Sequence, residues 1–407
     1  MVLSSMRSDL RESESFQAAL RWLEEHTSFS RPYDRRNMPL DSEVRRFCSE
    51  ASARLGNPHK SGFMVSVAGS KGKGTVSHLL CHHLMASGLS TGMALSPHLV
   101  DIRERSLVNL KMPSLEELGT AIIDISAISG VIEGRATFSG ILSLAAMQVF
   151  AKMRLDACII ECGLGGEHDS TGFIGAPLCI LTSVELEHTA QLGTDRCSIA
   201  AEKAGIVSEG ATLVCASIGE PELRTVKKLV DARGARLVVV DTRGLSARET
   251  NERLAITALS EFGALFGVMV TEADISEVTV PARDDLRTVG DAAVLFDGAH
   301  TPASLDNLAS RIQKRFHRPP ALVFGCSPPR DPDLLSERIR TQCSTAYFVS
   351  IGGTPPPDGF REVTIDELPE LFEREKHAVV TGSFHLVGDV MKHLGICPYG
   401  VLDNRRA

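Results

Sequence analysis

The glycine-rich sequence Ala68-Gly69-Ser70-Lys71-Gly72-Lys73-Gly74-Thr75 says most about how the first half of this chain folds. It follows the apolar run at residues 63–67 and precedes a helical pattern of apolar residues. In such a loop the glycines let backbone N–H groups converge on phosphate oxygens, and the following helix presents its positive end there. Lys73 would reach the terminal phosphates of a nucleotide, and the Thr75 hydroxyl would contact Mg²⁺ directly or through water. The alternative is a flexible turn with surface lysines, but a strand before the loop and a helix after it favour phosphate binding.

A second glycine-containing motif, Asp297-Gly298-Ala299-His300, follows another apolar run at residues 292–296. A phosphate loop alone predicts only that a nucleotide binds. Its combination with a distant motif, at the end of another strand-like run, favours an enzyme that transfers the phosphate to a second molecule.

The composition limits the class of protein. With 407 residues and 43% hydrophobic residues, the chain is long enough for two or three domains with cores of ordinary size. The net charge of −8 comes from 43 basic and 51 acidic residues mixed along the chain, which argues against a nucleic-acid-binding protein. The ten cysteines include no Cys-x-x-Cys pair, so we expect buried thiols in a reducing compartment. Because the N-terminus is polar and no apolar run is long enough to span a membrane, we expect a soluble, cytoplasmic protein.

Strand-like and helical patterns alternate along most of the chain. The alternation runs from residue 63 to residue 266, is interrupted by a polar stretch at residues 270–287, and resumes from residue 292 to residue 394. Alternation of this kind predicts mainly parallel sheets covered by helices. We therefore expect an α/β protein: an N-terminal ATPase domain around a mainly parallel sheet, and a smaller C-terminal Rossmann-like α/β domain. The expected boundaries are residues 1–280 for the first domain and residues 281–407 for the second.

Several polar side chains lie where a metal would be bound. Glu161 ends an apolar strand-like run, and in open parallel sheets ligands bind at the carboxyl ends of the strands. Mg²⁺ prefers hard oxygen ligands, so Glu161 suits it, with Ser96 of Ser96-Pro97-His98 as a weaker donor. His188 would be an unusual magnesium ligand, and an ordinary loop histidine is the alternative. Lys203 lies near the end of a short helical run, and taken alone it would be a lysine that interacts favourably with the helix dipole. Burial, however, could lower its pKa and let it react with CO₂.

The ordered motifs resemble those of the folylpolyglutamate synthase/dihydrofolate synthase family, within the Mur ligase superfamily. The likeness extends from about residue 16 to about residue 390. It is carried by the phosphate loop and by a series of shorter motifs: Leu55-Gly56-Asn57-Pro58, Ser96-Pro97-His98-Leu99, Glu161-Cys162-Gly163-Leu164-Gly165-Gly166, Thr182-Ser183, His188-Thr189, Glu202-Lys203-Ala204-Gly205-Ile206, Pro281-Ala282-Arg283, Asp297-Gly298-Ala299-His300 and Thr381-Gly382-Ser383.

The resemblance implies a role for each matching residue. Ser96, Glu161 and His188 look like magnesium ligands, and Lys203 resembles a lysine that becomes a further metal ligand when it is carbamylated by CO₂. ATP contacts are implied for the phosphate loop and for residues further along the chain: Gly69, Ser70, Lys71, Gly72, Lys73, Gly74, Thr75, Asn251, Arg283 and Asp297. The residues implied in catalysis are Lys73, His188, Lys203 and His300, the last of them near the transferred phosphate.

The resemblance also implies a reaction and its partners. ATP, with one or two Mg²⁺ ions, phosphorylates a substrate carboxylate and gives ADP and an acyl phosphate. An amine, glutamate in the family, then attacks the acyl phosphate, and phosphate leaves. The charge that develops on the transferred group would be neutralised by Mg²⁺ and Lys73. The expected partners are a small-molecule carboxylic acid and an amino acid, with neither nucleic acid nor membrane, and the protein would be a monomer or a small homo-oligomer.

The chain departs from the family pattern where the family holds its acid substrate. The family's Phe-Phe-Glu corresponds here to Phe138-Ser139-Gly140, so a carboxylate is missing. In a later glycine-rich motif, Glu167-His168 replaces Arg-Leu, which reverses a charge. A site that reads a substrate N–H through a buried carboxylate loses much of its discrimination without it. The expected acid-binding residues are Thr137, Phe138, Ser139, Gly140 and His168.

Three functions stay open at this point. The leading one is an ATP-dependent ligase, with folate polyglutamylation as its particular case. The second is the same chemistry on a non-folate acid. The third is a non-catalytic nucleotide-binding relative, which the altered pocket favours and the retained Glu161, Lys203 and His300 oppose. A phosphate-loop kinase or motor is disfavoured, because it would have a strand ending in Asp as metal partner and no second motif at residues 297–300.

Overall fold

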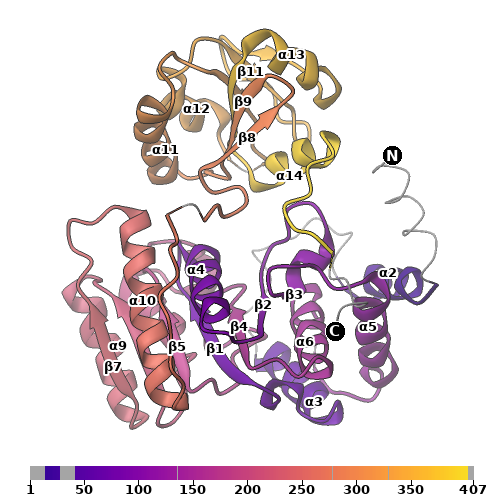
Figure 1. Ribbon diagram of the computed structural model, residues 1–407, viewed down its shortest axis with the longest axis vertical. Helices are drawn as coiled ribbons and strands as arrows, with labels where there is room; N and C mark the ends of the chain where they lie inside the picture. The colour runs from indigo at the N-terminus through magenta and orange to yellow at the C-terminus, as the bar shows by residue number, and fades with distance from the viewer. Residues whose placement is uncertain (1–13, 28–41, 135, 277, 329, 402–407) are drawn as a thin grey trace. The chain divides into compact units, whose positions relative to one another are not determined.

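The computed structural model describes residues 14–27, 42–134, 136–276, 278–328 and 330–401. These residues form two compact units, both drawn in Figure 1. Unit 1 contains the described residues of Met1–His98, Arg103–Ser276 and Tyr399–Ala407, and unit 2 contains those of Leu99–Ile102 and Glu277–Pro398. The polypeptide therefore crosses between the units more than once, and its last described residues belong with unit 1.

Unit 1 is built on a seven-stranded sheet with the order β3-β2-β4-β1-β5-β6-β7. Its strands are β1 Phe63–Ala68, β2 Thr91–Ala94, β3 Leu107–Val108, β4 Ala157–Glu161, β5 Leu178–Leu181, β6 Thr212–Ala216 and β7 Arg236–Val240. All neighbours are parallel except β3, which is antiparallel to β2. The central strands are almost wholly buried, as expected for continuous apolar runs in a parallel sheet covered on both faces. The register places Val67 beside Glu161 and Ala68 beside Leu181.

Helices of unit 1 connect and cover these strands. They are α2 Glu14–His26, α3 Ser42–Arg54, α4 Lys73–Ala86, α5 Leu115–Ser129, α6 Phe138–Lys152, α7 Thr189–Leu192, α8 Arg196–Ala204, α9 Glu220–Ala232 and α10 Ala247–Phe266, with the 3-10 turns η3 Pro58–Lys60 and η4 Ile102–Ser106. Side-chain oxygens of Ser114, Thr137 and Ser246 accept backbone N–H groups at the starts of α5, α6 and α10, which explains where those helices begin. Helices α4 and α10 pack against one another, as Figure 1 shows.

Unit 2 is a smaller α/β unit around a six-stranded sheet with the order β12-β11-β10-β13-β9-β8. Its elements are β8 Asp285–Val289, β9 Ala292–Phe296, α11 Pro302–Arg315, β10 Ala321–Phe324, α12 Pro332–Arg340, β11 Ala346–Phe348, β12 Arg361–Glu362, η5 Ile365–Glu367, α13 Leu368–Glu375, β13 His377–Thr381 and α14 Phe384–His393. All neighbours are parallel except β8, which is antiparallel to β9. Two separate clusters of buried apolar residues form its core, one containing Phe296 and Phe372 and the other containing Phe324 and Phe348.

The predicted α/β class, with a mainly parallel N-terminal sheet and a smaller C-terminal α/β unit, is confirmed. Strand β8 begins inside the stretch at residues 270–287 that the sequence predicts to be a break. The sequence does not reveal this edge strand because it alternates buried and more exposed residues and contains no apolar run. The predicted boundary after residue 280 differs from the observed division, in which Leu99–Ile102 belong with unit 2 and Tyr399 begins the return to unit 1. None of the helices in the described part of the chain combines the length and apolar composition that crossing a bilayer requires.

Candidate active site

The predicted phosphate loop connects β1 to the N-terminus of α4 at the carboxyl edge of the unit 1 sheet. Strand β1 lies between β4 and β5, and open α/β sheets bind ligands in a crevice at this edge. Gly72, the residue before α4, has a φ of 88°, and a side chain there would collide with the amide oxygen of Asn251. A glycine is therefore required at this position. The same contact shows that Asn251, on α10, lies directly against the loop.

The loop backbone is fastened to the residues that follow β5. Thr182 Oγ1 and Ser183 Oγ donate hydrogen bonds to the Lys71 carbonyl oxygen at 2.6 and 3.1 Å. In return, the Ser70 N–H donates to the Ser183 carbonyl at 3.0 Å, and the Lys71 N–H donates to Ser183 Oγ at 2.9 Å. A loop held in this way is already shaped for phosphate, which reduces the ordering cost of binding.

The side chains of the loop have distinct tasks. Lys73 Nζ donates to the Gly69 carbonyl at 2.9 Å, so its ammonium group stays within the loop. Ser70 Oγ accepts the Glu185 N–H at 2.9 Å and is thus used inside the protein. Thr75 lies in the first turn of α4 and is partly buried. The Lys73 ammonium group is thus kept at the loop predicted to bind phosphate, whereas the Ser70 hydroxyl accepts a hydrogen bond from the protein backbone.

The predicted magnesium ligands Glu161 and Ser96 are close together. Glu161 is the last residue of β4 and only 8% exposed, and the Ser96 N–H donates to its Oε2 at 3.4 Å. A Cβ atom on Gly74 would lie 3.5 Å from the same carboxylate oxygen, so the phosphate loop borders it. Within the described residues no three His, Cys, Asp or Glu side chains gather as a metal site. The pair of oxygen donors Glu161 and Ser96 nevertheless suits Mg²⁺, which typically completes its coordination shell with substrate phosphate and water.

Lys203 is buried and paired with a carboxylate that the sequence reasoning did not single out. Its Nζ lies 3.3 Å from Glu187 Oε1, while Glu187 Oε2 lies 3.7 Å from Lys71 Nζ. Burial lowers the pKa of Lys203, Lys73 lowers it further, and Glu187 opposes the shift. Burial by itself would raise the pKa of Glu187, but Lys203 and Lys71 hold it below its usual value. His188, the third predicted magnesium ligand, comes directly after Glu187 and has a left-handed backbone at the start of α7.

A buried arginine lies beside the predicted acid pocket. The Arg105 guanidinium carbon is 5.2 Å from the centroid of the Phe138 ring, and its Nε donates to His98 Nδ1 at 2.9 Å. Burial lowers the pKa of Arg105 to about 10, against the opposing attraction of the Glu161 and Glu104 carboxylates. Sequence reasoning missed Arg105 because a run of alternating charges such as residues 103–105 usually lies on the surface. Here η4 holds all of that run inside unit 1.

The predicted acid pocket and the predicted magnesium ligands both lie close to Gly163. A Cβ atom on Gly163 would lie 3.3 Å from Ser139 Oγ, 3.4 Å from Asp169 Oδ2 and 3.7 Å from Ser96 Oγ. Asp169 is buried, which raises the pKa of its carboxyl group, while hydrogen bonds from Leu164 and Thr171 oppose that shift. The predicted pocket residue Ser139 is therefore a close neighbour of the predicted magnesium ligand Ser96.

The space beside Gly140 is filled. Gly140 lies in the first turn of α6, where its N–H donates to the Thr137 side chain at 3.1 Å. A Cβ atom on Gly140 would lie 2.9 Å from Cys48 Sγ, 3.0 Å from Thr137 Oγ1 and 3.2 Å from the Ser170 Cβ. The missing family carboxylate has thus been replaced by packed side chains and not by an open hole.

The charge reversal at Glu167 is matched inside the protein. Glu167 Oε1 lies 3.3 Å from Arg233 Nη2, so its carboxylate is paired there. The neighbouring His168 bonds through Nδ1 to Glu202 Oε2 at 2.8 Å, and Glu202 Oε1 accepts the His168 N–H at 3.0 Å and the Gly166 N–H at 3.2 Å. Both replacements contact the helix that carries Lys203, because the Glu167 N–H also donates to the Glu202 carbonyl, at 2.9 Å.

In unit 2, Asp297 follows β9 and holds a turn together. Its Oδ1 accepts the Ala299 N–H at 3.0 Å, and its Oδ2 accepts the Asp284 N–H at 2.9 Å. Arg311 of α11 donates to the same Oδ2 at 3.0 Å. Asp297 is 3% exposed, so its carboxylate has a structural role in shaping this loop as well as the ATP contact predicted for it.

Arg283 and His300 lie in the same region of unit 2. Arg283 Nη1 donates to the Ala282 carbonyl at 3.0 Å, and its guanidinium carbon is 5.1 Å from the centroid of the Phe384 ring. His300 Nδ1 lies 2.8 Å from the Gly298 carbonyl, which can only accept, so this nitrogen carries the proton. The structure thus gathers the predicted site residues of the second half, Arg283, Asp297 and His300, around one turn of unit 2.

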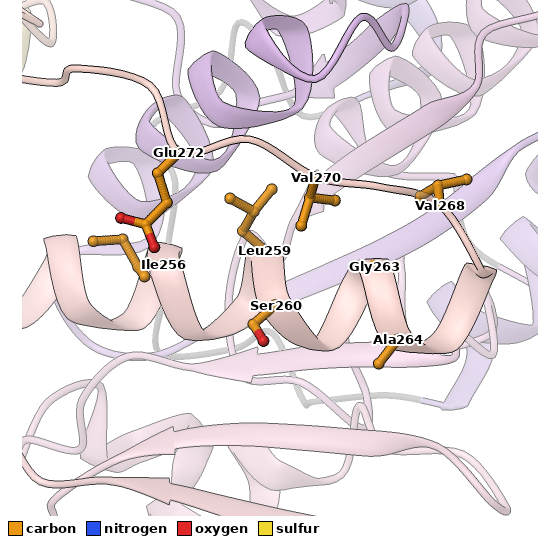
Figure 2. Close-up of a pocket in the computed structure, with 8 residues that line it drawn as sticks. All are labelled: Ile256, Leu259, Ser260, Gly263, Ala264, Val268, Val270 and Glu272. Carbon is orange, nitrogen blue, oxygen red and sulfur yellow. The ribbon is translucent and has the colours of Figure 1, made fainter.

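A surface pocket elsewhere on unit 1 contains none of the predicted residues. It lies between α10 and the segment that follows this helix, and mostly apolar side chains line it together with Ser260 and Glu272 (Figure 2). It offers neither a phosphate cradle nor a convergent set of acids, bases or metal ligands. The phosphate loop edge therefore remains the candidate active site.

Known proteins resemble this chain along most of its length. It is 31% identical over 291 residues to the dihydrofolate synthase/folylpolyglutamate synthase of Escherichia coli, covering 65% of this chain and 67% of that protein. It is 25% identical over 394 residues to the folylpolyglutamate synthase of Lacticaseibacillus casei, covering 84% of this chain and 92% of that protein. No protein-family model matches the chain.

Solved structures agree with these relatives. The apo form of L. casei FPGS superposes with a TM-score of 0.80 at 22% identity, covering 93% of this chain and 99% of that one. E. coli FolC in complex with ADP, without folate substrate, superposes with a TM-score of 0.75 at 25% identity, covering 93% and 97%. The family resemblance carried by the motifs is thereby confirmed. This chain belongs to the folylpolyglutamate synthase/dihydrofolate synthase family of ATP-dependent ligases.

Proposed function

We propose that this chain uses ATP to activate a carboxylic acid as an acyl phosphate and couples the activated acid to glutamate. A carboxylate oxygen of the acid bonds to the γ-phosphorus as ADP leaves, and the glutamate amine then bonds to the acyl carbon as phosphate leaves and the nitrogen loses a proton. The observation that carries the proposal is the convergence of the phosphate loop, Glu161 and Ser96, with the buried Arg105 close enough to interact with Glu161.

The nucleotide would be held by the phosphate loop and by residues further along the chain. Backbone N–H groups of the loop and the Lys73 ammonium group would bind the phosphates, and Lys73 would neutralise charge that develops on the transferred phosphoryl group. Asn251 supports this assignment because it touches the loop at Gly72. Arg283 and Asp297 are proposed as further ATP contacts, and His300 as a residue near the transferred phosphate.

Glu161 and Ser96 are proposed to hold Mg²⁺, which supplies charge neutralisation at the phosphoryl group when bound. His188 is proposed as a further ligand. For Lys203, burial favours the neutral amine, whose nitrogen can bond to the carbon of CO₂ and release a proton to form a carbamate. The ion pair between Lys203 and Glu187, at 3.3 Å, opposes this step because it stabilises the ammonium form. We therefore propose carbamylation only for the state in which Glu187 has released Lys203.

Folate-type acids are the first candidates for the substrate. One solved neighbour is an FPGS-AMPPCP-folate complex and another is E. coli FolC in complex with DHPP and ADP. The Arg105 cation stacked on Phe138 would pair with a substrate carboxylate, and His168 would border the acid. A second candidate, the same reaction on a non-folate acid, is supported by the filled space at Gly140, where a family carboxylate is absent.

The location and the oligomeric state of the protein can be considered separately from its chemistry. The ten cysteines are free thiols, most of them buried, which supports a reducing, cytoplasmic location. The monomer or small homo-oligomer expected from the sequence stays a prediction.

The decisive experiment measures ADP release from purified full-length protein supplied with ATP, Mg²⁺, glutamate and one acid at a time. The acids are dihydropteroate, folates of increasing glutamate number, and unrelated mono- and dicarboxylic acids. We expect ADP and phosphate only when an acid and glutamate are both present, and hydroxylamine should trap the acyl phosphate as a hydroxamate. Release of AMP and pyrophosphate would exclude the mechanism. Nucleotide binding without turnover on any acid would instead support the non-catalytic alternative.

A further inference from the structure

The last described residues of the chain form part of unit 1, although they follow unit 2 in the sequence. The Met112 N–H donates to the Gly400 carbonyl at 2.7 Å, and Val401 makes a parallel bridge with Met112. These contacts hold the segment Tyr399–Val401, here called the C-terminal clip, against the N-terminal half of unit 1. Only a short segment separates the end of α14 in unit 2 from the clip. The clip is therefore the point at which the polypeptide returns from unit 2 to unit 1.

The clip reaches the phosphate loop through one buried histidine. His78, on α4, is 4% exposed, and its Nε2 lies 2.6 Å from the Tyr399 hydroxyl. Its Nδ1 lies 2.6 Å from the Gly74 carbonyl oxygen. A carbonyl can only accept, so Nδ1 carries the proton, and Nε2 accepts the hydrogen of the Tyr399 hydroxyl. The two rings also stack, with centroids 6.0 Å apart and planes inclined by 21°.

This hydrogen-bonded chain ends on a peptide group that matters for phosphate. The Gly74 carbonyl and the Thr75 N–H belong to the same planar peptide unit and point in opposite directions, so fixing one fixes the other. The Thr75 N–H is in the first turn of α4, where backbone N–H groups have no acceptor within the helix. Such N–H groups are the ones that bind phosphate. A hydrogen bond to the carbonyl also polarises the peptide and strengthens its N–H as a donor.

We propose that Tyr399 is a positioning residue for nucleotide binding, acting through His78 to hold the Gly74–Thr75 peptide with its N–H directed at phosphate. This inference rests on the proposed function of the phosphate loop. It makes the C-terminal clip a working part of the nucleotide site, although the clip contributes no atom to the loop itself. The competing interpretation is that the Tyr399 hydroxyl only anchors the end of the chain.

The test replaces Tyr399 by Phe in the full-length protein, which keeps the stacked ring and removes the hydroxyl. One lost hydrogen bond should weaken binding of a non-hydrolysable ATP analogue by roughly threefold to tenfold, and raise the KM for ATP by the same factor with kcat little changed. Tyr347→Phe is the matched control, because the Tyr347 hydroxyl also makes a 2.6 Å hydrogen bond, to Glu375 within unit 2. The control should leave the Kd unchanged.

A double-mutant cycle with His78→Phe then tests whether Tyr399 acts through His78. Removal of the Tyr399 hydroxyl should cost no further affinity once the imidazole is gone. An unchanged Kd in Tyr399→Phe, with or without a lower Tm, would show that Tyr399 only anchors the chain and would overturn the proposal. Additive losses in the cycle would overturn it as well. Failure of the wild-type protein to bind the analogue would instead contradict the proposed function, so the two failures are distinguishable.

Discussion

The phosphate loop and the predicted acid pocket lie at the same edge of the unit 1 sheet, but the loop is formed mainly by backbone groups and the predicted pocket by side chains. The loop is held by backbone groups: the Lys71 N–H and carbonyl bond to Ser183 and Thr182. Because Lys71 makes these hydrogen bonds with its backbone alone, a change of its side chain should leave them intact. The pocket is lined by side chains, and at Gly140 its shape is set by the atoms that pack there. A site built from backbone tolerates changes of side chain, whereas a site built from side chains changes its ligand.

The largest expected effect separates two lysines of the same loop. Lys73→Ala should lower kcat roughly 100- to 1,000-fold, because it removes the ammonium group that we propose neutralises the transferred phosphoryl group. Lys71→Ala is the matched control, since Lys71 serves the loop through its backbone and its side chain makes a partly exposed ion pair with Glu187. Its activity should stay within about fivefold of wild type. Activity is measured as ADP release. Equal losses in the two variants would contradict the claim that Lys71 serves the loop through its backbone and Lys73 through its ammonium group.

The next effect concerns the pocket alone. Arg105→Met should raise the KM for the acid roughly 30- to 100-fold, because it removes the buried cation that we propose pairs with the substrate carboxylate. The Kd of a non-hydrolysable ATP analogue should hardly change, because the loop backbone is untouched. Arg105→Lys keeps the charge and should recover part of the acid affinity without the planar stacking on Phe138. A loss of nucleotide affinity equal to the loss of acid affinity would show that the two regions are not separable.

Restoring the family's carboxylate should not restore the family's pocket. Gly140→Glu is expected to lower the free energy of unfolding by about 2–4 kcal/mol, because the new side chain overpacks against Cys48 and buries a charge. The figure is a net loss: it already allows for the roughly 1 kcal/mol by which replacing a glycine stabilises a helix. Gly130→Glu is the control, since nothing lies within 4 Å of a Cβ there. Urea unfolding measures both, and equal stability of the two variants would refute the packing argument.

The smallest effect is a dependence of the free energy of unfolding on pH that comes from Lys203, the buried lysine near the phosphate loop. Burial lowers the pKa of Lys203 below its usual value of 10.5. Between the folded pKa and 10.5 the unfolded chain therefore binds more protons than the folded one, and the free energy of unfolding rises with pH across that window. Lys203→Gln should remove this rise. The difference between wild-type and variant unfolding curves, measured by denaturant at several alkaline pH values, isolates the contribution of Lys203, and identical slopes would contradict it.

Sequence reasoning found the residues that act through local pattern. The phosphate loop was recognisable because its glycines, its lysine and the flanking strand and helix are contiguous, and Glu161 because it ends an apolar run. It missed Glu187, although this residue stands next to the predicted His188, because nothing local shows that Lys203 and Lys71 both reach it. It missed Arg105 for the same reason, since a charged run at residues 103–105 looks solvent-exposed until η4 is seen buried. In the sequence Glu167 stands only as a reversal of charge next to the predicted pocket residue His168, and only the fold shows that Arg233 pairs with it.

By itself, the sequence determined the α/β class, the order of the elements, the family and the place of the phosphate loop, because each of these depends on neighbouring residues and on their periodicity. The tertiary structure decided which distant groups meet: Asn251 against Gly72, Cys48 against Gly140, and Tyr399 against His78. These contacts join residues far apart in the chain, and they depend on how the helices pack on the sheet, which no local pattern encodes. We expect substrate choice to depend on contacts of this second kind, because the predicted acid pocket is formed by them.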